Sequence, residues 1–259
     1  MHAIDFAGRA VVITGGTRGI GAGIARAFLD AGADVLVCGR SDPGGAVLAA
    51  GGRSALRTRA DVRDPAQAHR LIREAADSFG RVDVVVSNAG GSPYAEAATA
   101  SPRFHARIIE LNLIAPLHVA QSANAVMQDQ AGGGSIIMIG SVSGVRPSPG
   151  TAAYGAAKAG LHQLATSLAV EWAPKVRVNS VVAGPVATEA GAAGHYGDAA
   201  AQAAVGATVP AGRMAAPEDV AGACLFLASP LASHVSGAAL LVHGGGERPA
   251  YLAAAQRPV

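Results

Sequence analysis

A tyrosine and a lysine four residues apart, Tyr154 and Lys158, are the side chains in this sequence best suited to proton transfer. Residues with this spacing share one face of an α-helix, so the two groups would lie together. A tyrosine with its ordinary pKa of about 10 is a poor acid or base at neutral pH, and a nearby ammonium lowers that pKa by stabilising the phenolate. The pair therefore predicts a proton donor to a carbonyl oxygen that becomes negative as the carbon accepts hydride.

Two further polar residues could complete this group. Ser141 lies thirteen residues before Tyr154 and is expected to hydrogen-bond the substrate oxygen, with Ser143 as an alternative donor. The alternative reading is an ordinary serine at the end of a strand. Asn112 falls inside a long helical segment, an unfavourable place for asparagine unless its side chain is used.

The segment from Thr14 to Gly21 has the composition of a loop that binds a dinucleotide. Glycines here allow a sharp turn and let backbone N–H groups approach a pyrophosphate, which the following helix N-terminus also attracts. No Gly-Lys-Ser/Thr follows, so a nucleoside triphosphatase is disfavoured. The residues expected to contact the cofactor in this loop are Gly15, Thr17, Arg18, Gly19, Ile20 and Gly21.

The residues that follow the second and third strands bear on which cofactor binds. NAD-preferring sites usually place an acid at the end of the second strand, where this chain has Gly39 followed by Arg40. Together with Arg18, Arg40 suits a 2′-phosphate and favours NADPH, although both arginines could instead be ordinary solvated side chains. Asp61 could hold the adenine amino group, and Val62 beside it is also expected to contact the cofactor. Asn88, Ala89 and Gly90 would lie against the cofactor, with Asn88 also bracing neighbouring strands.

Short apolar runs alternate with longer helical patterns along the whole chain, which predicts a parallel sheet with helices on both faces. We expect one α/β domain over residues 1–259, with a doubly wound (Rossmann) sheet of about seven strands. The expected strands are Ala10–Thr14, Asp34–Cys38, Ser54–Thr58, Val82–Ser87, Gly134–Ile139, Arg177–Val182 and Ala238–Val242. The expected helices are Ile20–Ala31, Pro65–Phe79, Ser101–Gln130, Ala152–Trp172 and Pro217–Ala228. Residues 188–210, which are rich in Gly and Ala, are expected to form a substrate lid or, alternatively, a variable surface loop.

Composition limits the other classes of function. Of 259 residues, 50% are hydrophobic and 15% charged, and the net charge of +2 with scattered arginines argues against a nucleic-acid partner. Cys38 and Cys224 have no metal-ligand or disulfide spacing, and no metal site is expected. With no signal peptide and no apolar run long enough to span a membrane, the chain is expected to be cytoplasmic, with no membrane partner.

These motifs, in this order, resemble the short-chain dehydrogenase/reductase family over nearly the full length. The resemblance rests on Thr14–Gly21, Asp61-Val62, Asn88-Ala89-Gly90, Asn112, Ser141, Tyr154 through Lys158, and Asn179 through Thr188. It implies an Asn–Ser–Tyr–Lys catalytic group, in which Asn112 helps to hold a water linking Lys158 to solvent. Tyr154 and Lys158 are also expected to contact the cofactor, the lysine through the ribose hydroxyls. It also implies that the backbone at Pro185 and Val186 meets the nicotinamide, assisted by Thr188, and that the protein is a homotetramer.

Two residues depart from the family pattern. Ala183 stands where a proline commonly precedes the glycine, which could loosen the loop, and His243 stands where relatives usually have aspartate. The expected activity is hydride transfer between NADPH and a small carbonyl or secondary alcohol, such as a ketone or an oxoacyl thioester. The alternatives are an NAD-dependent alcohol dehydrogenase of the same family and a non-catalytic dinucleotide-binding regulator. Tyr94, His195 and Tyr196 are possible polar contacts to a substrate that the sequence does not identify.

Overall fold

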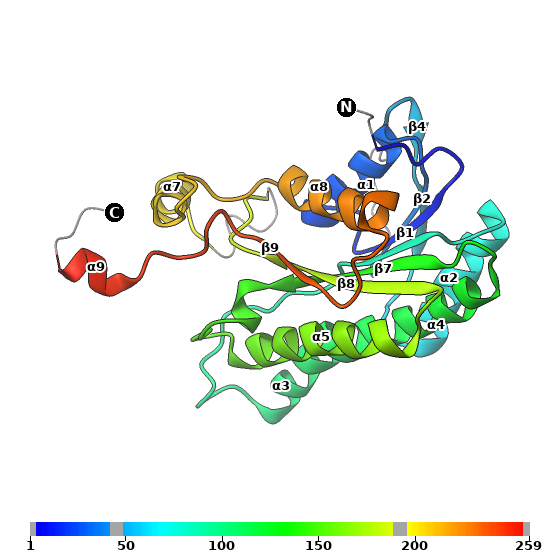
Figure 1. Cartoon of the computed structure of the whole chain (residues 1–259). Helices are drawn as coiled ribbons and strands as arrows, with labels where there is room; N and C mark the ends of the chain where they lie inside the picture. The colour runs from blue at the N-terminus through cyan, green and yellow to red at the C-terminus, as the bar shows by residue number, and fades with distance from the viewer. Residues whose placement is uncertain (1–3, 42–48, 189–195, 256–259) are drawn as a thin grey trace.

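Seven parallel strands form the centre of the computed structural model, which describes residues 4–41, 49–188 and 196–255 (Figure 1). Their order in the sheet is β5-β2-β1-β6-β7-β8-β9, so the chain moves outward from β1 in one direction and then in the other. The predicted doubly wound α/β fold is confirmed. The strands are β1 (Ala10–Thr14), β2 (Asp34–Gly39), β5 (Leu56–Arg59), β6 (Val84–Ser87), β7 (Gly134–Ser141), β8 (Val176–Ala183) and β9 (Ala239–Val242).

Helices cover both faces of this sheet. In Figure 1, α1 and α8 lie on one face, and α2, α4 and α5 lie on the other. The helices are α1 (Gly19–Asp30), α2 (Pro65–Phe79), α3 (Pro102–Ile109), α4 (Ala115–Asp129), α5 (Ala152–Glu171), α7 (Ala199–Thr208), α8 (Pro217–Ala228) and α9 (Ala250–Ala254).

Strand β1 shows why a strand in the middle of this sheet is largely apolar. All five of its residues are buried, with Val12 in the core beneath α2, α4 and α5, and Val11 and Ile13 in the core beneath α1 and α8. A strand covered on both faces needs an apolar side chain at every position, rather than at every second one.

Two helix boundaries follow directly from local sequence. The Asp64 side chain accepts hydrogen bonds from the backbone N–H groups of Ala66 and Gln67, with Pro65 at the first helical position of α2. At the other end, Gly80 takes the left-handed conformation, φ +74°, that a helix C-cap requires.

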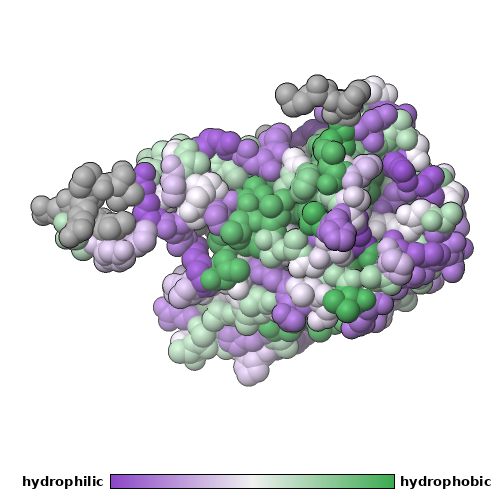
Figure 2. Space-filling model, viewed as in Figure 1, coloured by the Kyte–Doolittle hydropathy of each residue, from purple (hydrophilic) through white to green (hydrophobic). Residues whose placement is uncertain are grey.

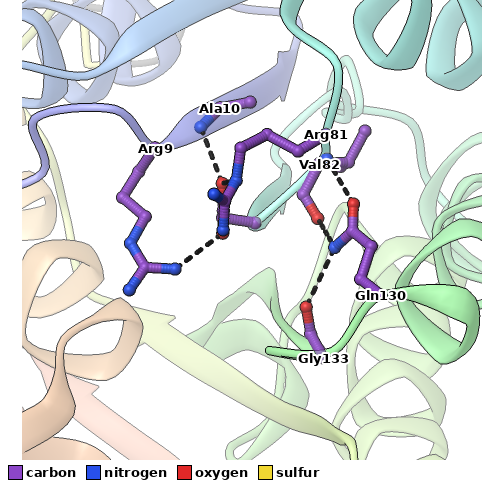
Figure 3. Close-up of polar contacts among 7 residues, drawn as sticks. Arg9, Ala10, Arg81, Val82, Gln130 and Gly133 are labelled. Carbon is purple, nitrogen blue, oxygen red and sulfur yellow. Dashed lines mark hydrogen bonds and ion pairs between the residues drawn. The ribbon is translucent and has the colours of Figure 1, made fainter.

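The starts of β1 and β6 are joined by one carboxylate, Asp83 (Figure 3). It accepts hydrogen bonds from the Ala10 backbone and from the side chains of Arg9 and Arg81, at 2.6–2.9 Å. Burial raises the pKa of Asp83, but these bonds outweigh it and hold the pKa below its ordinary value. The cluster lies at the edge of the sheet opposite the strand ends that carry the predicted chemistry, so it fixes strand position rather than a site.

Besides shifts of one or two residues at element ends and the added short helix α9, the structure differs from the predicted elements in three main places. The expected helix Ser101–Gln130 is broken by a π-helical turn, Glu110–Ile114 (η1), between α3 and α4. The expected strand Ser54–Thr58 is divided, because Ser54 belongs to a short hairpin of β3 (Ala49–Ala50) and β4 (Arg53–Ser54). The expected lid contains α7, whose alanine-rich sequence has no strong apolar stripe to reveal it.

One face of the molecule carries exposed hydrophobic side chains. Figure 2 shows them gathered over the region of α8 and β9. Strand β9 is an edge strand, and its Leu241 side chain is half exposed. Within the described ranges, no helix has both the length and the apolar character needed to cross a membrane.

Candidate active site

A cleft of about 730 Å³ lies at the carboxyl edge of the sheet, where ligands bind in open α/β folds. Segments that follow β1, β2, β5, β6, β7 and β8 all border it. Most of the predicted site residues line it: Gly15, Thr17, Arg18, Gly19, Ile20, Arg40, Asp61, Val62, Asn88, Ala89, Gly90, Ser141, Tyr154, Lys158, Val186 and Thr188. Gly21, Asn112 and Pro185 are not among the residues that line it.

The glycine loop is folded as tightly as its composition predicts. Gly15 and Gly19 have φ angles of +63° and +55°, a region that other residues rarely adopt. A Cβ atom on Gly21 would lie 2.2 Å from the Gly15 carbonyl oxygen and 2.6 Å from the Asn88 amide nitrogen. That amide donates to the carbonyls of Thr14 and Gly15, so Asn88 braces the loop against β1. The Thr14 hydroxyl accepts the backbone N–H of Asn88, a contact that sequence reasoning missed.

This packing makes Gly21 intolerant of a side chain. We expect Gly21→Ala to cost about 1–3 kcal/mol of unfolding free energy, because the added methyl overlaps backbone that cannot move away cheaply, and to weaken dinucleotide binding. Gly222→Ala is the matched control, since nothing lies within 4 Å of a Cβ there on α8. Urea unfolding and cofactor fluorescence titration of both variants check this. Equal behaviour of the two would contradict the argument.

Two arginines stand at the end of the cleft formed by β1 and β2. Arg18 and Arg40 are both exposed and both line the cleft. A Cβ atom on Gly39 would lie 3.2 Å from the Thr17 hydroxyl, so little room exists here for an acidic side chain. Arg59, on β5, donates a 3.0 Å hydrogen bond to the Arg40 carbonyl and fixes the backbone at this point. The local charge is positive, which suits an anion.

Asp61 forms an ion pair that was not expected from the sequence. Its carboxylate forms an ion pair with Arg63, two residues on, through several hydrogen bonds. The hydrogen bond from the Arg63 side chain is the largest of the effects that lower the pKa of Asp61. The carboxylate therefore stays ionised, and it still lines the cleft. The opposite charges two residues apart were visible in the sequence as a signal for this pair.

Tyr154, Ser141 and Lys158 come together at the other end of the cleft. The Tyr154 and Ser141 side chains are hydrogen-bonded. The Ser141 hydroxyl also accepts the backbone N–H of Ser143 at 3.2 Å, which orients it at the end of β7. The Lys158 ammonium lies 5.6 Å from the centre of the Tyr154 ring and donates to the Ile139 carbonyl at 2.8 Å.

Burial, rather than the lysine, dominates the ionisation of Tyr154. Desolvation raises the pKa of Tyr154, and the hydrogen bond from Ser141 opposes that rise only in part. Desolvation also lowers the pKa of Lys158 from 10.5 to about 8. The pKa of Tyr154 is therefore raised here rather than lowered, because desolvation of the phenol outweighs the effects that oppose it. At neutral pH the phenol is therefore protonated and holds a proton that it could transfer.

Asn112 belongs to the π-helical turn and is fully buried. Its amide exchanges a pair of 2.9 Å hydrogen bonds with the Gly91 backbone and donates a third to the Ile108 carbonyl. A Cβ atom on Gly90 would lie 2.8 Å from the Asn112 Oδ1 atom and 3.3 Å from the Lys158 ammonium, so both side chains approach the same side of Gly90. A π-turn is frequent at functional sites, and here it turns the asparagine toward the cleft floor.

The segment after β8 is held firmly. Backbone bonds join Pro185 and Ala187 to Ala215, at 2.8–2.9 Å. Ala183, expected to loosen this loop, is the last residue of β8 and is paired with Ser141 and Val242, so the ladder holds it. A Cβ atom on Gly184 would lie 2.8 Å from the His243 Cβ, which identifies His243 as a packing residue.

The predicted substrate contacts have different outcomes. Tyr196 lines the cleft, whereas the Tyr94 ring packs on Gly150 and is 73% exposed. His195 lies outside the described residues. Leu111 and Ser92 also line the cleft, although their types gave no signal in the sequence. In the described part of the chain, no three His, Cys, Asp or Glu side chains cluster as metal ligands would.

The cleft fits a nicotinamide dinucleotide. A glycine loop without room for a Cβ lies against a helix N-terminus at its centre, where a pyrophosphate would bind. Cationic and acidic residues border one end, and the Ser141–Tyr154–Lys158 group borders the other. The volume of the cleft and the chemistry of its lining therefore both suit a nicotinamide dinucleotide.

Comparison with known proteins gives a consistent result. Residues 15–247 match the family model described as enoyl-(acyl carrier protein) reductase. Cis-4-hydroxycyclohexanecarboxylate dehydrogenase from Sinomonas cyclohexanicum is 39% identical, covering 93% of this chain and 97% of the relative. L-rhamnose 1-dehydrogenase (NAD(P)(+)) from a Sphingomonas species is 36% identical, covering 92% of this chain and 96% of the relative.

A solved structure agrees along almost the entire chain. The crystal structure of a short-chain type dehydrogenase/reductase from Mycobacterium marinum superposes with a TM-score of 0.87 at 33% identity. The match covers 95% of this chain and 98% of that one.

Proposed function

The chain belongs to the short-chain dehydrogenase/reductase family, oxidoreductases that act on alcohols and carbonyls, and we propose that it uses NADPH to reduce a small carbonyl substrate. Supporting this proposal is the meeting, in one cleft, of two arginines at one end and a half-buried, protonated tyrosine at the other. A protonated Tyr154 suits reduction, because the carbonyl oxygen must receive a proton as the carbon accepts hydride.

In the proposed reaction, the dinucleotide supplies hydride to the carbonyl carbon. Ser141 donates a hydrogen bond to the carbonyl oxygen and orients the substrate. Tyr154 gives its proton to that oxygen as negative charge develops there. Lys158 stabilises the phenolate that remains, since an ammonium at short range favours a nearby anion.

The region around Asn112 is suited to replacing the proton that Tyr154 gives up. The Asn112 side chain fixes Gly91 by reciprocal hydrogen bonds and, like Lys158, approaches Gly90. We propose that a water held here links Lys158 to solvent. Val186 and Thr188, beside the glycine loop, would contact the nicotinamide end.

The cofactor preference is tested at Arg40. We expect Arg40→Asp to weaken NADPH binding about 10–100-fold, the loss of one or two charge-assisted bonds, and to affect NADH far less. Fluorescence titration of both cofactors measures this, with Arg73→Asp on α2 as a control that makes the same charge change. Equal losses for NADPH and NADH would favour the NAD-dependent alternative.

Catalysis itself is tested by NADPH oxidation with a panel of ketones. A non-catalytic regulator would bind the dinucleotide and turn over none of them. The relatives named above act on a hydroxycyclohexanecarboxylate and a sugar, so alicyclic and polyhydroxy ketones belong in the panel.

The remaining parts of the proposal concern the domain organisation, the cellular location and the oligomeric state of the enzyme. We propose one domain with a lid near residues 188–210, a cytoplasmic location and a homotetramer. The hydrophobic surface over α8 and β9 supports subunit contact, because exposed apolar patches commonly mark interfaces (Figure 2).

A further inference from the structure

A second cavity, of about 490 Å³, adjoins the proposed active-site cleft. Ser143, two residues after Ser141, lines both. Proline and alanine side chains form its apolar walls, and Arg146 is the only charged residue among the described residues that line it. An apolar cavity with one cation at its border suits an organic anion.

The Arg146 guanidinium is fixed in place but not saturated. Its Nε atom pairs with the Glu247 carboxylate at 2.7 Å, and its Nη1 atom donates to the Pro147 carbonyl at 2.8 Å. No hydrogen bond from the third nitrogen, Nη2, is found within the described ranges. A guanidinium has five N–H donors in a rigid plane, so this one retains donors for a further acceptor.

The positive charge of Arg146 acts on Tyr196, a residue that lines the cleft. Burial raises the pKa of Tyr196, which lines the cleft, and Arg146 lowers it. Tyr196 in turn adds to the raised pKa of Tyr154, after the larger effect of burial. Arg146, Tyr196 and Tyr154 therefore lie in electrostatic reach of one another, with the cation next to the substrate end of the cleft.

The beginning of α5 adds to this positive potential. Its first residues, Ala152, Gly155 and Ala156, border the second cavity. The Thr151 side chain does not cap the helix and instead bonds to the Ser148 hydroxyl at 2.6 Å. The unpaired N–H groups of a first helical turn favour an anion nearby.

We propose that Arg146 binds the carboxylate of an oxo-acid substrate whose ketone is reduced beside Tyr154. This inference rests on the proposed carbonyl reductase activity and assigns its substrate class. A single carboxylate matches the site better than a phosphate does, because Glu247 already offsets part of the one positive charge.

Matched pairs of an oxo acid and its methyl ester test the proposal. The probes are 4-oxopentanoate and 4-oxocyclohexanecarboxylate, each with its ester, reduced with NADPH by the full-length protein. We expect kcat/KM for the acid to exceed that for the ester about tenfold or more. Arg146→Gln should remove this preference, Arg146→Lys should retain part of it, and Arg73→Gln, a distant arginine on α2, should leave it intact.

Binding without turnover separates this inference from the proposed activity. Calorimetric titration of cyclohexanecarboxylate into the protein with NADP+ should show binding that Arg146→Gln weakens about tenfold. If no ketone is reduced, the proposed function fails, whereas binding that depends on Arg146 still supports a carboxylate site. Equal acid and ester rates in the unmodified enzyme, or binding unchanged in both Arg146 variants, overturns the inference. A thermal unfolding scan of each variant verifies that it is folded.

Discussion

Tyr154→Phe is expected to lower kcat for ketone reduction by about 10²–10⁴, the usual contribution of a positioned proton donor. Phenylalanine keeps the ring that lies 5.6 Å from Lys158 but removes the hydroxyl bonded to Ser141. NADPH affinity should change little, because the glycine loop and the arginines at the other end of the cleft remain. Single-turnover kinetics and cofactor titration measure the two quantities separately.

Tyr251→Phe is the matched control for this substitution. Tyr251 is 69% exposed on α9 and lies outside the cleft, so loss of its hydroxyl should leave kcat unchanged. If Tyr154→Phe reduces ketones as fast as the unmodified enzyme does, Tyr154 is not the proton donor.

The fold could be predicted because its signals are local. Continuous apolar runs such as Ala10–Thr14 are required where a strand is buried on both faces, and Asp64-Pro65 marks a helix start. The π-turn at Glu110–Ile114 could not be predicted, since it arises where α3 and α4 must both pack while Asn112 turns inward to bond Gly91. Tertiary contacts, not the propensities of those five residues, favour that geometry.

Which residues lie together in the site could be predicted, because the carboxyl ends of parallel strands meet at one edge of the sheet. Ser141, Tyr154 and Asn88 follow elements whose carboxyl ends meet at one edge, so order along the chain implied nearness in space. The state of each group was not predictable in this way. Arg63 neutralises Asp61, and burial governs the ionisation of Tyr154, because both effects depend on distances and solvent exclusion that only the folded chain defines.

The fold lowers the pKa of Lys158, and this change can be tested by experiment. Lys158 is buried, and desolvation lowers its pKa to about 8, well below its value in an unfolded chain. Between these two values the unfolded state binds more protons, so the free energy of unfolding rises as pH increases through that window. Below about pH 8 the enzyme therefore tolerates a buried charge, held by the Ile139 carbonyl, that opposes its stability.

Lys158→Met isolates this effect and its catalytic counterpart. The difference in unfolding free energy between the unmodified protein and the variant should shift in favour of the unmodified protein by about 2 kcal/mol from pH 7 to pH 9.5, as measured by urea unfolding. A difference that does not vary with pH would show that Lys158 titrates normally.

In the same pH range, kcat/KM for ketone reduction by the unmodified enzyme should fall above about pH 8, because the ammonium that stabilises the Tyr154 phenolate is lost. The variant should be about 10² slower at pH 7 and should lack this decline, which links the stability cost of the buried lysine to its role in proton transfer.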